Sequence, residues 1–130
     1  ELQDELGLAM LFVTHDLGVI AQICDEVSVL YAGQIVEHCD VATLFPHPSH
    51  PYTEGLLAAM PSLGNSDESL YGIPGNIPSP RRMPSGCRFH PRCPYVEDSC
   101  RTREPSPIEL ETGQQTRCLR HSEIELKGIS

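Results

Sequence analysis

The sequence predicts an α/β fold of two or three strands with helices, followed by a loop-rich appendage that a metal holds together. Strand-like apolar runs and helical spacing share the first 45 residues, which is typical of an α/β unit. All twelve prolines lie at or beyond Pro46, so we expect one domain over residues 1–45 and another over residues 46–130. The second part contains four cysteines in a tail with few apolar side chains: Cys87, Cys93, Cys100 and Cys118.

The first 24 residues are expected to form a helix, a strand and a second helix. Two leucines spaced four apart predict a short helix over residues 1–7. The continuous apolar run 8–13 has the length and composition of a buried parallel strand. Asp16 or Thr14 can cap a helix over about residues 17–24. The side chains expected to face inward on that helix are Val19, Ile20 and Ile23.

A strand pair and a short helix are expected next. Residues 26–31 have the composition of a strand, and residues 34–38 suit a returning strand. Ala32 and Gly33 lie between them and predict a tight turn. Asp40 can cap a short helix, whose apolar side chains are Val41, Leu44 and Phe45.

Proline positions shape the prediction beyond residue 46. Pro51 suits the first position of a helix whose remaining residues are 52–60, and Pro61 would end that helix. Residues 62–86 have little periodicity and several prolines, so we expect an extended path there. Residues 81–130 contain ten apolar side chains besides the cysteines, too few for a hydrophobic core to offset the entropy of ordering the segment.

The cysteines are spaced Cys-x5-Cys-x6-Cys-x17-Cys. Structural zinc sites usually begin with two cysteines a few residues apart, so these wider gaps favour an iron–sulfur cluster. Zinc, disulfides and free thiols are the alternatives. We expect the site to stabilise the tail rather than to catalyse a reaction, with redox or iron sensing as the other possible role.

Other residues could complete or border this site. His90 or His121 could replace one cysteine ligand. Cys24 and Cys39 are expected to be small buried apolar residues instead of ligands. A role at the loop-to-helix junction, rather than metal binding, is expected for His47 and His50.

Charge is unevenly distributed along the chain. Residues 1–80 carry a net charge of −11 with no Lys or Arg, whereas residues 81–130 carry +2. The acidic part argues against broad nucleic-acid binding, which needs a dense basic surface. The arginines near the cysteines either form a solvated surface or offset the negative charge of a thiolate-bound centre: Arg81, Arg82, Arg88, Arg92, Arg101 and Arg103.

Hydropathy and the first residues suggest where the protein works. No apolar run is long enough to span a bilayer, so we expect no transmembrane segment. No export signal is recognisable, so a reducing cytosol is expected, in which disulfides are disfavoured. The first residue is Glu rather than Met, and we therefore expect the chain to be part of a longer protein.

Several stretches resemble a family of transporter ATPases. Residues 12–19, which include Thr14-His15-Asp16, and residues 25–37 resemble the switch-histidine loop and the following strand pair of an ATP-binding cassette. Residues 50–61 and 84–94, with the two later cysteines, are similar to the C-terminal extension of the oligopeptide/dipeptide transporter ATP-binding subunits.

This resemblance implies a fold and site residues. The fold would be the C-terminal fragment of a P-loop ATP-binding cassette, with His15 as the catalytic switch histidine that contacts the γ-phosphate and helps position the attacking water. The four cysteines match residues that carry a 4Fe–4S cluster in related subunits. The Walker A loop, Gln loop, signature motif and Walker B carboxylate have no counterpart here, so these residues alone are expected neither to bind ATP tightly nor to hydrolyse it.

For the parent subunit, the resemblance implies binding of ATP and Mg²⁺ and hydrolysis that drives peptide uptake. Its partners would be a second ATP-binding subunit and membrane permeases, at the cytoplasmic face of the inner membrane, and the fragment itself could dimerise. The solute, whether a dipeptide, an oligopeptide, nickel or glutathione, would be selected mainly by other subunits. The alternative function is a metal-dependent interaction module that senses redox state or iron without catalysis.

Overall fold

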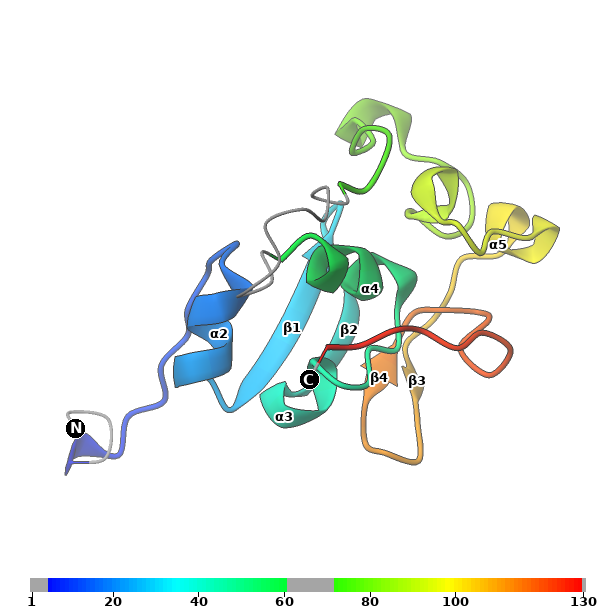
Figure 1. Ribbon diagram of the computed structural model, residues 1–130. Coiled ribbons are helices and arrows are strands. Elements are labelled where there is room, and N and C mark those ends of the chain that lie inside the picture. Colours follow the sequence, from blue (N-terminus) through cyan, green and yellow to red (C-terminus); the bar gives the residue numbers. More distant parts are fainter. Residues whose placement is uncertain (1–4, 61–71, 130) are drawn as a thin grey trace, which may run out of the picture.

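The computed structural model describes residues 5–60 and 72–129 of the chain, and Figure 1 shows a small sheet with helices beside it and an irregular tail. Residues 5 and 6 are helical and Gly7 follows with a φ of +61°, which agrees with the predicted first helix where it is described. The remaining elements, in chain order, are α2 (Leu17–Ile23), β1 (Glu26–Tyr31), β2 (Gln34–Asp40), α3 (Val41–Leu44), α4 (Pro51–Ala58), η1 (Pro80–Arg82), η2 (His90–Arg92), α5 (Asp98–Thr102), β3 (Ile108–Glu109) and β4 (Gln115–Thr116).

The sheet begins with the predicted hairpin. Strands β1 and β2 pair in antiparallel fashion, with Glu26 opposite Asp40 and Tyr31 opposite Gln34. The turn residues Ala32 and Gly33 both have positive φ, +47° and +78°, as a two-residue hairpin turn that matches the strand twist requires. Strand β1 has the predicted bounds, and β2 extends two residues beyond its predicted end.

The tail supplies the other half of the sheet, which the sequence did not predict. Strand β4 pairs with β2 and β3 pairs with β4, so the order is β1-β2-β4-β3 and every pairing is antiparallel. The Arg117 N–H also donates to the Val36 carbonyl at 2.8 Å. Because β3 and β4 are two residues each, they are too short to produce a periodic pattern, and the tail is less irregular than predicted.

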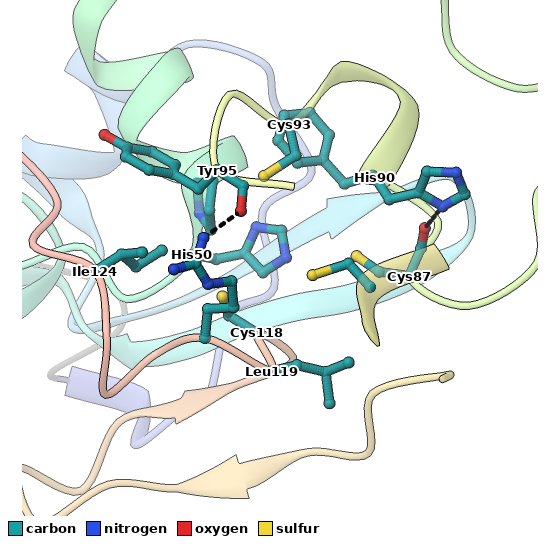
Figure 2. Close-up of a pocket in the computed structure, with 12 residues that line it drawn as sticks. His50, Cys87, His90, Cys93, Tyr95, Cys118, Leu119 and Ile124 are labelled. Carbon is teal, nitrogen blue, oxygen red and sulfur yellow. Dashed lines mark hydrogen bonds between the residues drawn. The ribbon is translucent and has the colours of Figure 1, made fainter. Parts of the chain in front are cut away.

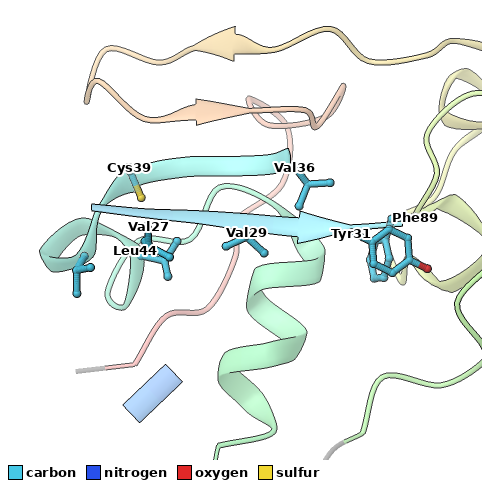
Figure 3. Packing of buried hydrophobic residues seen from close by; sticks show 8 residues of the cluster. Val27, Val29, Tyr31, Val36, Cys39, Leu44 and Phe89 are labelled. Atoms are coloured by element: carbon cyan, nitrogen blue, oxygen red, sulfur yellow. The ribbon is translucent and has the colours of Figure 1, made fainter. Parts of the chain in front are cut away.

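One cluster of apolar side chains lies under the sheet. Residues on β1 alternate between exposed and buried, and α3 packs against both β1 and β2. Helix α4 lies across the same face and buries Leu57 (Figure 3). The buried members of the cluster are Val27, Val29, Tyr31, Val36, Cys39, Val41, Leu44 and Phe89. Cys39 is therefore buried as predicted, whereas Cys24 is half-buried and packs against the cluster.

The predicted parallel strand over residues 8–13 is wrong. These residues have no regular structure, and Leu11 and Val13 are 92% and 95% exposed. A buried parallel strand needs a hydrogen-bonded neighbour on at least one side, and none of the strands in the described residues pairs with this run. Its apolar side chains therefore lie in solvent.

Helix α2 has the predicted bounds within one residue, but its orientation differs. The Asp16 carboxylate caps it by accepting from the N–H groups of Gly18 and Val19, at 2.9 and 3.2 Å. Val19 and Ile23, predicted to face inward, are 41% and 50% exposed. Among the three predicted inward residues, Ile20 alone packs against the core.

The next helices follow the prediction more closely. Asp40 directly precedes α3, but its side chain makes no capping hydrogen bond, so the predicted cap is wrong in detail. Helix α4 begins at Pro51 as predicted and ends at Ala58, two residues earlier than expected. Pro61, which was predicted to end this helix, lies outside the described residues. Residues 62–71 of the predicted extended segment lie outside them as well.

None of the helices in the described ranges combines the length and apolar character needed to cross a bilayer.

A buried carboxylate on β2 joins three parts of this fold. Glu37 is 1% exposed and accepts hydrogen bonds from the N–H groups of Ser49 and His50, at 2.7 and 3.0 Å. Gln114, in the β3–β4 turn, donates to the same carboxylate at 3.5 Å and to the His47 carbonyl at 2.7 Å. Burial raises the pKa of Glu37 above its ordinary value of 4.5.

Replacing Glu37 is expected to destabilise the fold. Glu37→Ala leaves two buried N–H groups without an acceptor, which should cost about 2–4 kcal/mol of unfolding free energy in urea. Glu37→Gln keeps one acceptor oxygen and should cost less. The exposed Glu109→Ala variant is the control, with a change of about 0.5 kcal/mol or less.

The stability of the same variants should depend differently on pH. Above pH 4.5 the folded state retains a proton on Glu37 that the unfolded chain has released, so wild type should lose stability relative to Glu37→Gln as the pH rises through the raised pKa. Equal stabilities for Glu37→Ala and Glu109→Ala would contradict the role given to this carboxylate.

Candidate metal centre

The structure brings the four predicted cysteines together at one cavity. Cys87, Cys93, Cys100 and Cys118 come from separate segments of the tail, and all four line a cavity of about 20 Å³. Figure 2 shows the side chains of Cys87, Cys93 and Cys118 around this shared space. A cavity of this size has room for about one water molecule.

A backbone hydrogen bond connects two of the cysteines. The Cys87 N–H donates to the Cys100 carbonyl at 2.8 Å. Gly86, which precedes Cys87, has a φ of +69°, and a side chain there would overlap the backbone of Cys100 and Arg101. Glycine is therefore required at this position, because the loop that carries Cys87 passes directly over α5.

The other two cysteines follow short elements. Cys93 ends η2, where its N–H donates to the His90 carbonyl at 3.3 Å. Cys118 lies two residues after β4, so the pairing of β4 with β2 places its sulfur in the cavity. A two-residue strand thus positions one of the four thiols.

Burial raises the pKa of three of the thiols at the cavity. It raises the pKa of Cys87, raises that of Cys93 to about 11 and raises that of Cys118 to about 12. The neighbouring cysteines add to each increase, because several thiolates would repel one another in the same cavity. A metal would have to displace these protons to bind sulfur.

The side chains as they stand do not surround a single metal ion. In the described residues, no group of three or more His, Cys, Asp or Glu side chains could hold one. The donor set itself is soft and sulfur-rich, which is the chemistry that zinc and iron–sulfur clusters select. The four thiols therefore fit such a group by type and by location, but their present spacing does not form a closed site for one ion.

The histidines divide into different roles. His50 is buried at the N-cap of α4, where its Nδ1 accepts from the Tyr52 N–H at 3.1 Å, so the predicted junction role is confirmed for His50. Burial lowers the pKa of His50 to about 3. His90 lines the cavity with its Nδ1 3.0 Å from the Cys87 carbonyl, whereas His121 does not line it.

His15, the candidate catalytic residue, is exposed and directly precedes the Asp16 cap of α2. Figure 1 places α2 on the opposite side of the molecule from α5, which carries Cys100. The two candidate sites named from the sequence are therefore separate in space.

Two of the arginines near the cysteines, Arg88 and Arg92, bind backbone carbonyls. Arg88 donates to the Ala32 carbonyl at 2.8 Å, and Arg92 donates to the carbonyls of Ile73 and Pro74, both at 2.9 Å. None of the six arginines named from the sequence lines the cavity in the described part of the chain. Arg120, which was not among the arginines named from the sequence, lines the cavity and donates to the Tyr95 carbonyl at 2.8 Å. Its position two residues after Cys118 was the available signal.

The central half of the chain matches a known family. The family model described as the oligopeptide/dipeptide transporter, C-terminal region, matches residues 36–100, and the chain belongs to this family. The match begins on β2 and ends at Cys100, so it includes α4, its histidine cap and three of the four cysteines.

Individual relatives extend the similarity to most of the chain. The oligopeptide transport ATP-binding protein AppD of Bacillus subtilis is 42% identical over 123 residues, which cover 95% of this chain and 38% of AppD. A Brucella ovis protein named for peptide import and ATP binding is 45% identical over 130 residues, with the same two coverages. A Brucella abortus protein with a similar name is 46% identical over 118 residues, which cover 90% of this chain and 35% of that protein. The chain thus spans little more than a third of these curated relatives.

Phe89 is expected to hold the cysteine segment on the sheet. Its ring is 2% exposed and packs edge-on against Tyr31, with 5.1 Å between ring centroids, and against Tyr52 at 5.4 Å. Phe89→Ala should therefore lower the unfolding free energy by about 3–5 kcal/mol and speed alkylation of the cavity cysteines. Ile77→Ala, at an exposed position, is the control, and an equal effect of the two substitutions would contradict this role.

Proposed function

We propose that this chain is the C-terminal part of the ATP-binding subunit of an importer that couples ATP hydrolysis to peptide uptake. The observation that carries the proposal is the similarity to AppD and the two Brucella proteins over at least 90% of the chain. In the parent subunit, ATP and Mg²⁺ would bind upstream of the residues described here. A second ATP-binding subunit and membrane permeases would be its partners, at the cytoplasmic face of the membrane.

Within this chain, we propose that residues 1–45 belong to the ATP-binding cassette and residues 46–130 to the family's C-terminal extension. His15 would then be the switch histidine of the cassette. Its exposure supports this role, because a side chain that reaches a nucleotide in the assembled subunit must not be buried in its own chain. An exposed apolar run ends at Val13, two residues before His15, as expected if further cassette strands cover that run in the parent subunit.

We also propose that the four cysteines hold a 4Fe–4S cluster. The support is that four thiols, on four segments, line one cavity. Each thiolate of such a cluster binds a different iron, so the four sulfurs need not surround one point, as the ligands of a single zinc ion must. In their present positions no three of these side chains could hold one ion, so the cysteine segments would have to rearrange on binding.

The cluster would supply cross-links between chain segments, a structural role. Apart from the cysteines, the cavity lining includes the apolar side chains of Phe89, Leu119 and Ile124. The chain's own contribution would be four sulfur ligands, exclusion of water by these apolar walls, and a cation nearby at Arg120.

The cysteine proposal is tested by anaerobic purification of the intact subunit. We expect absorbance near 400 nm with about four irons and four sulfides per chain, and single Cys→Ser changes at the four positions should reduce both. Cys24→Ser, at a half-buried cysteine outside the cavity, is the matched control. Zinc in place of iron would refute the cluster, and metal-free wild type would refute any metal centre.

The His15 proposal is tested in the same intact subunit. His15→Ala should lower ATP turnover by about 100-fold or more, because a group that positions the attacking water is lost, while ATP binding stays near wild type. His38→Ala, at a histidine on β2, is the control. Wild-type turnover in His15→Ala would remove this residue from the mechanism.

A further inference from the structure

Residues 124–129, which we call the latch segment, run from the cysteine tail back to the helices beside the sheet. They have no regular structure. Figure 1 shows them in red, directed toward α3. The Ile129 N–H donates to the Phe45 carbonyl, at the end of α3, with a distance of 2.7 Å. The latch segment thus connects the tail to the first part of the chain.

The first residue of the latch segment is part of the cavity wall. Ile124 lines the cavity together with the cysteines, and Figure 2 shows it at the edge of the group. Its N–H donates to the Arg120 carbonyl at 3.2 Å, and the His121 N–H donates to the Cys118 carbonyl at 3.3 Å. One turn therefore joins the latch segment to Cys118, so a displacement of the segment would open the wall beside this cysteine.

One carboxylate on α4 holds the middle of the latch segment. Glu54 accepts from the Lys127 N–H at 2.7 Å. It also accepts from the Tyr95 hydroxyl, which lies 2.9 and 3.2 Å from its two oxygens. Because Tyr95 lines the cavity as well, the same carboxylate fixes the latch segment and a second part of the cavity wall.

Gly128 lets the latch segment lie directly on the backbone that follows α3. A Cβ at this position would overlap backbone atoms of Phe45 and Pro46. Backbone atoms cannot rotate out of the way as a flexible side chain can, so a residue larger than glycine does not fit. Any side chain at residue 128 would therefore push the latch segment off its place.

The latch segment is attached less firmly than the sheet. Lys127 and Gly128 are exposed, and the hydrogen bond from Lys127 to Glu54 is open to solvent. By contrast, Cys39 is 5% exposed on β2, which pairs with β1 and β4. Segments with exposed hydrogen bonds and few buried contacts open at a lower free energy than core strands do. We therefore expect the latch segment to open while the sheet remains folded.

We propose that the latch segment is a movable cover of the cysteine cavity, and that its opening gives a soft metal ion or a thiol reagent access to the buried thiol of Cys118. Cys118 is 8% exposed when the cover is closed. Cys87 and Cys93 are half-buried and do not depend on this opening in the same way. The inference concerns the free thiols and holds whichever group, if any, the four sulfurs bind.

Alkylation by N-ethylmaleimide of the intact subunit, reduced and freed of metal by a chelator, tests this cover. Mass spectrometry of the peptides follows each cysteine separately. Cys39 is the internal reference, because its burial is similar to that of Cys118 and it reports unfolding of the sheet. In wild type, we expect Cys118 to react about tenfold faster than Cys39 or more, at a rate nearly independent of low urea concentrations.

Two glycine substitutions form a matched pair. Gly128→Ala should displace the latch segment and speed alkylation of Cys118 about tenfold or more, while Cys39 reacts as in wild type. Gly72→Ala should change neither rate, because a Cβ there meets nothing within 4 Å. Glu54→Ala removes the acceptor of the Lys127 N–H and should act in the same direction as Gly128→Ala.

The two reporter cysteines separate a movable cover from general stabilisation. Equal acceleration of Cys118 and Cys39 in Gly128→Ala would overturn the inference, and so would an unchanged rate at Cys118. If Gly128→Ala fails to fold, wild type decides, because the same urea dependence at both cysteines would also overturn it. Each of these results leaves the cluster proposal untouched, since that proposal is decided by the iron and sulfide content of the untreated subunit.

Discussion

The buried carboxylate of Glu37 is the interaction on which the arrangement of this molecule depends. It lies on β2, accepts from the N–H groups of Ser49 and His50 at the start of α4, and receives Gln114 from the β3–β4 turn. A buried carboxyl group is costly unless it is hydrogen-bonded, so these donors and Glu37 require one another. Because one of the donors is the backbone of His50, the same contact fixes the histidine that lines the cysteine cavity.

The tail is held by more than its cysteines. Phe89 packs into the aromatic group with Tyr31 and Tyr52, and Tyr31 and Tyr52 themselves lie 4.7 Å apart by ring centroid. Arg88 and Arg92 bind backbone carbonyls of distant segments, so their charges serve as directional donors that tie the tail down. Phe89 is thus the apolar side chain of the cysteine segment that enters the core cluster of the sheet, and Cys87 and Cys93 pack against that cluster. A metal centre would add to this packing and would not replace it.

The sequence predicted what depends on local pattern. The hairpin with its Ala32–Gly33 turn, the Asp16 cap and the Pro51 helix start all follow from residues adjacent in the chain. The grouping of the cysteines was predicted from their number in a segment poor in apolar residues. Three features escaped because they depend on distant partners: the pairing of β4 with β2, the burial of Glu37, and the exposure of residues 8–13, whose composition suits a strand that has no neighbour in the described residues.

The His50-Pro51-Tyr52 sequence shows how one short motif connects the two parts of the chain. The histidine caps α4 through Nδ1, the proline begins the helix, and the tyrosine ring packs on Tyr31 of β1. The other edge of the histidine ring lines the cavity formed by the tail. A displacement of the cysteine loops would therefore press on a residue whose backbone is bound to Glu37 of the sheet. Phe89 makes a second connection, because it also lines the cavity and its ring packs on Tyr31 of β1, so the cavity and the β1–β2 hairpin share buried residues from both parts of the chain.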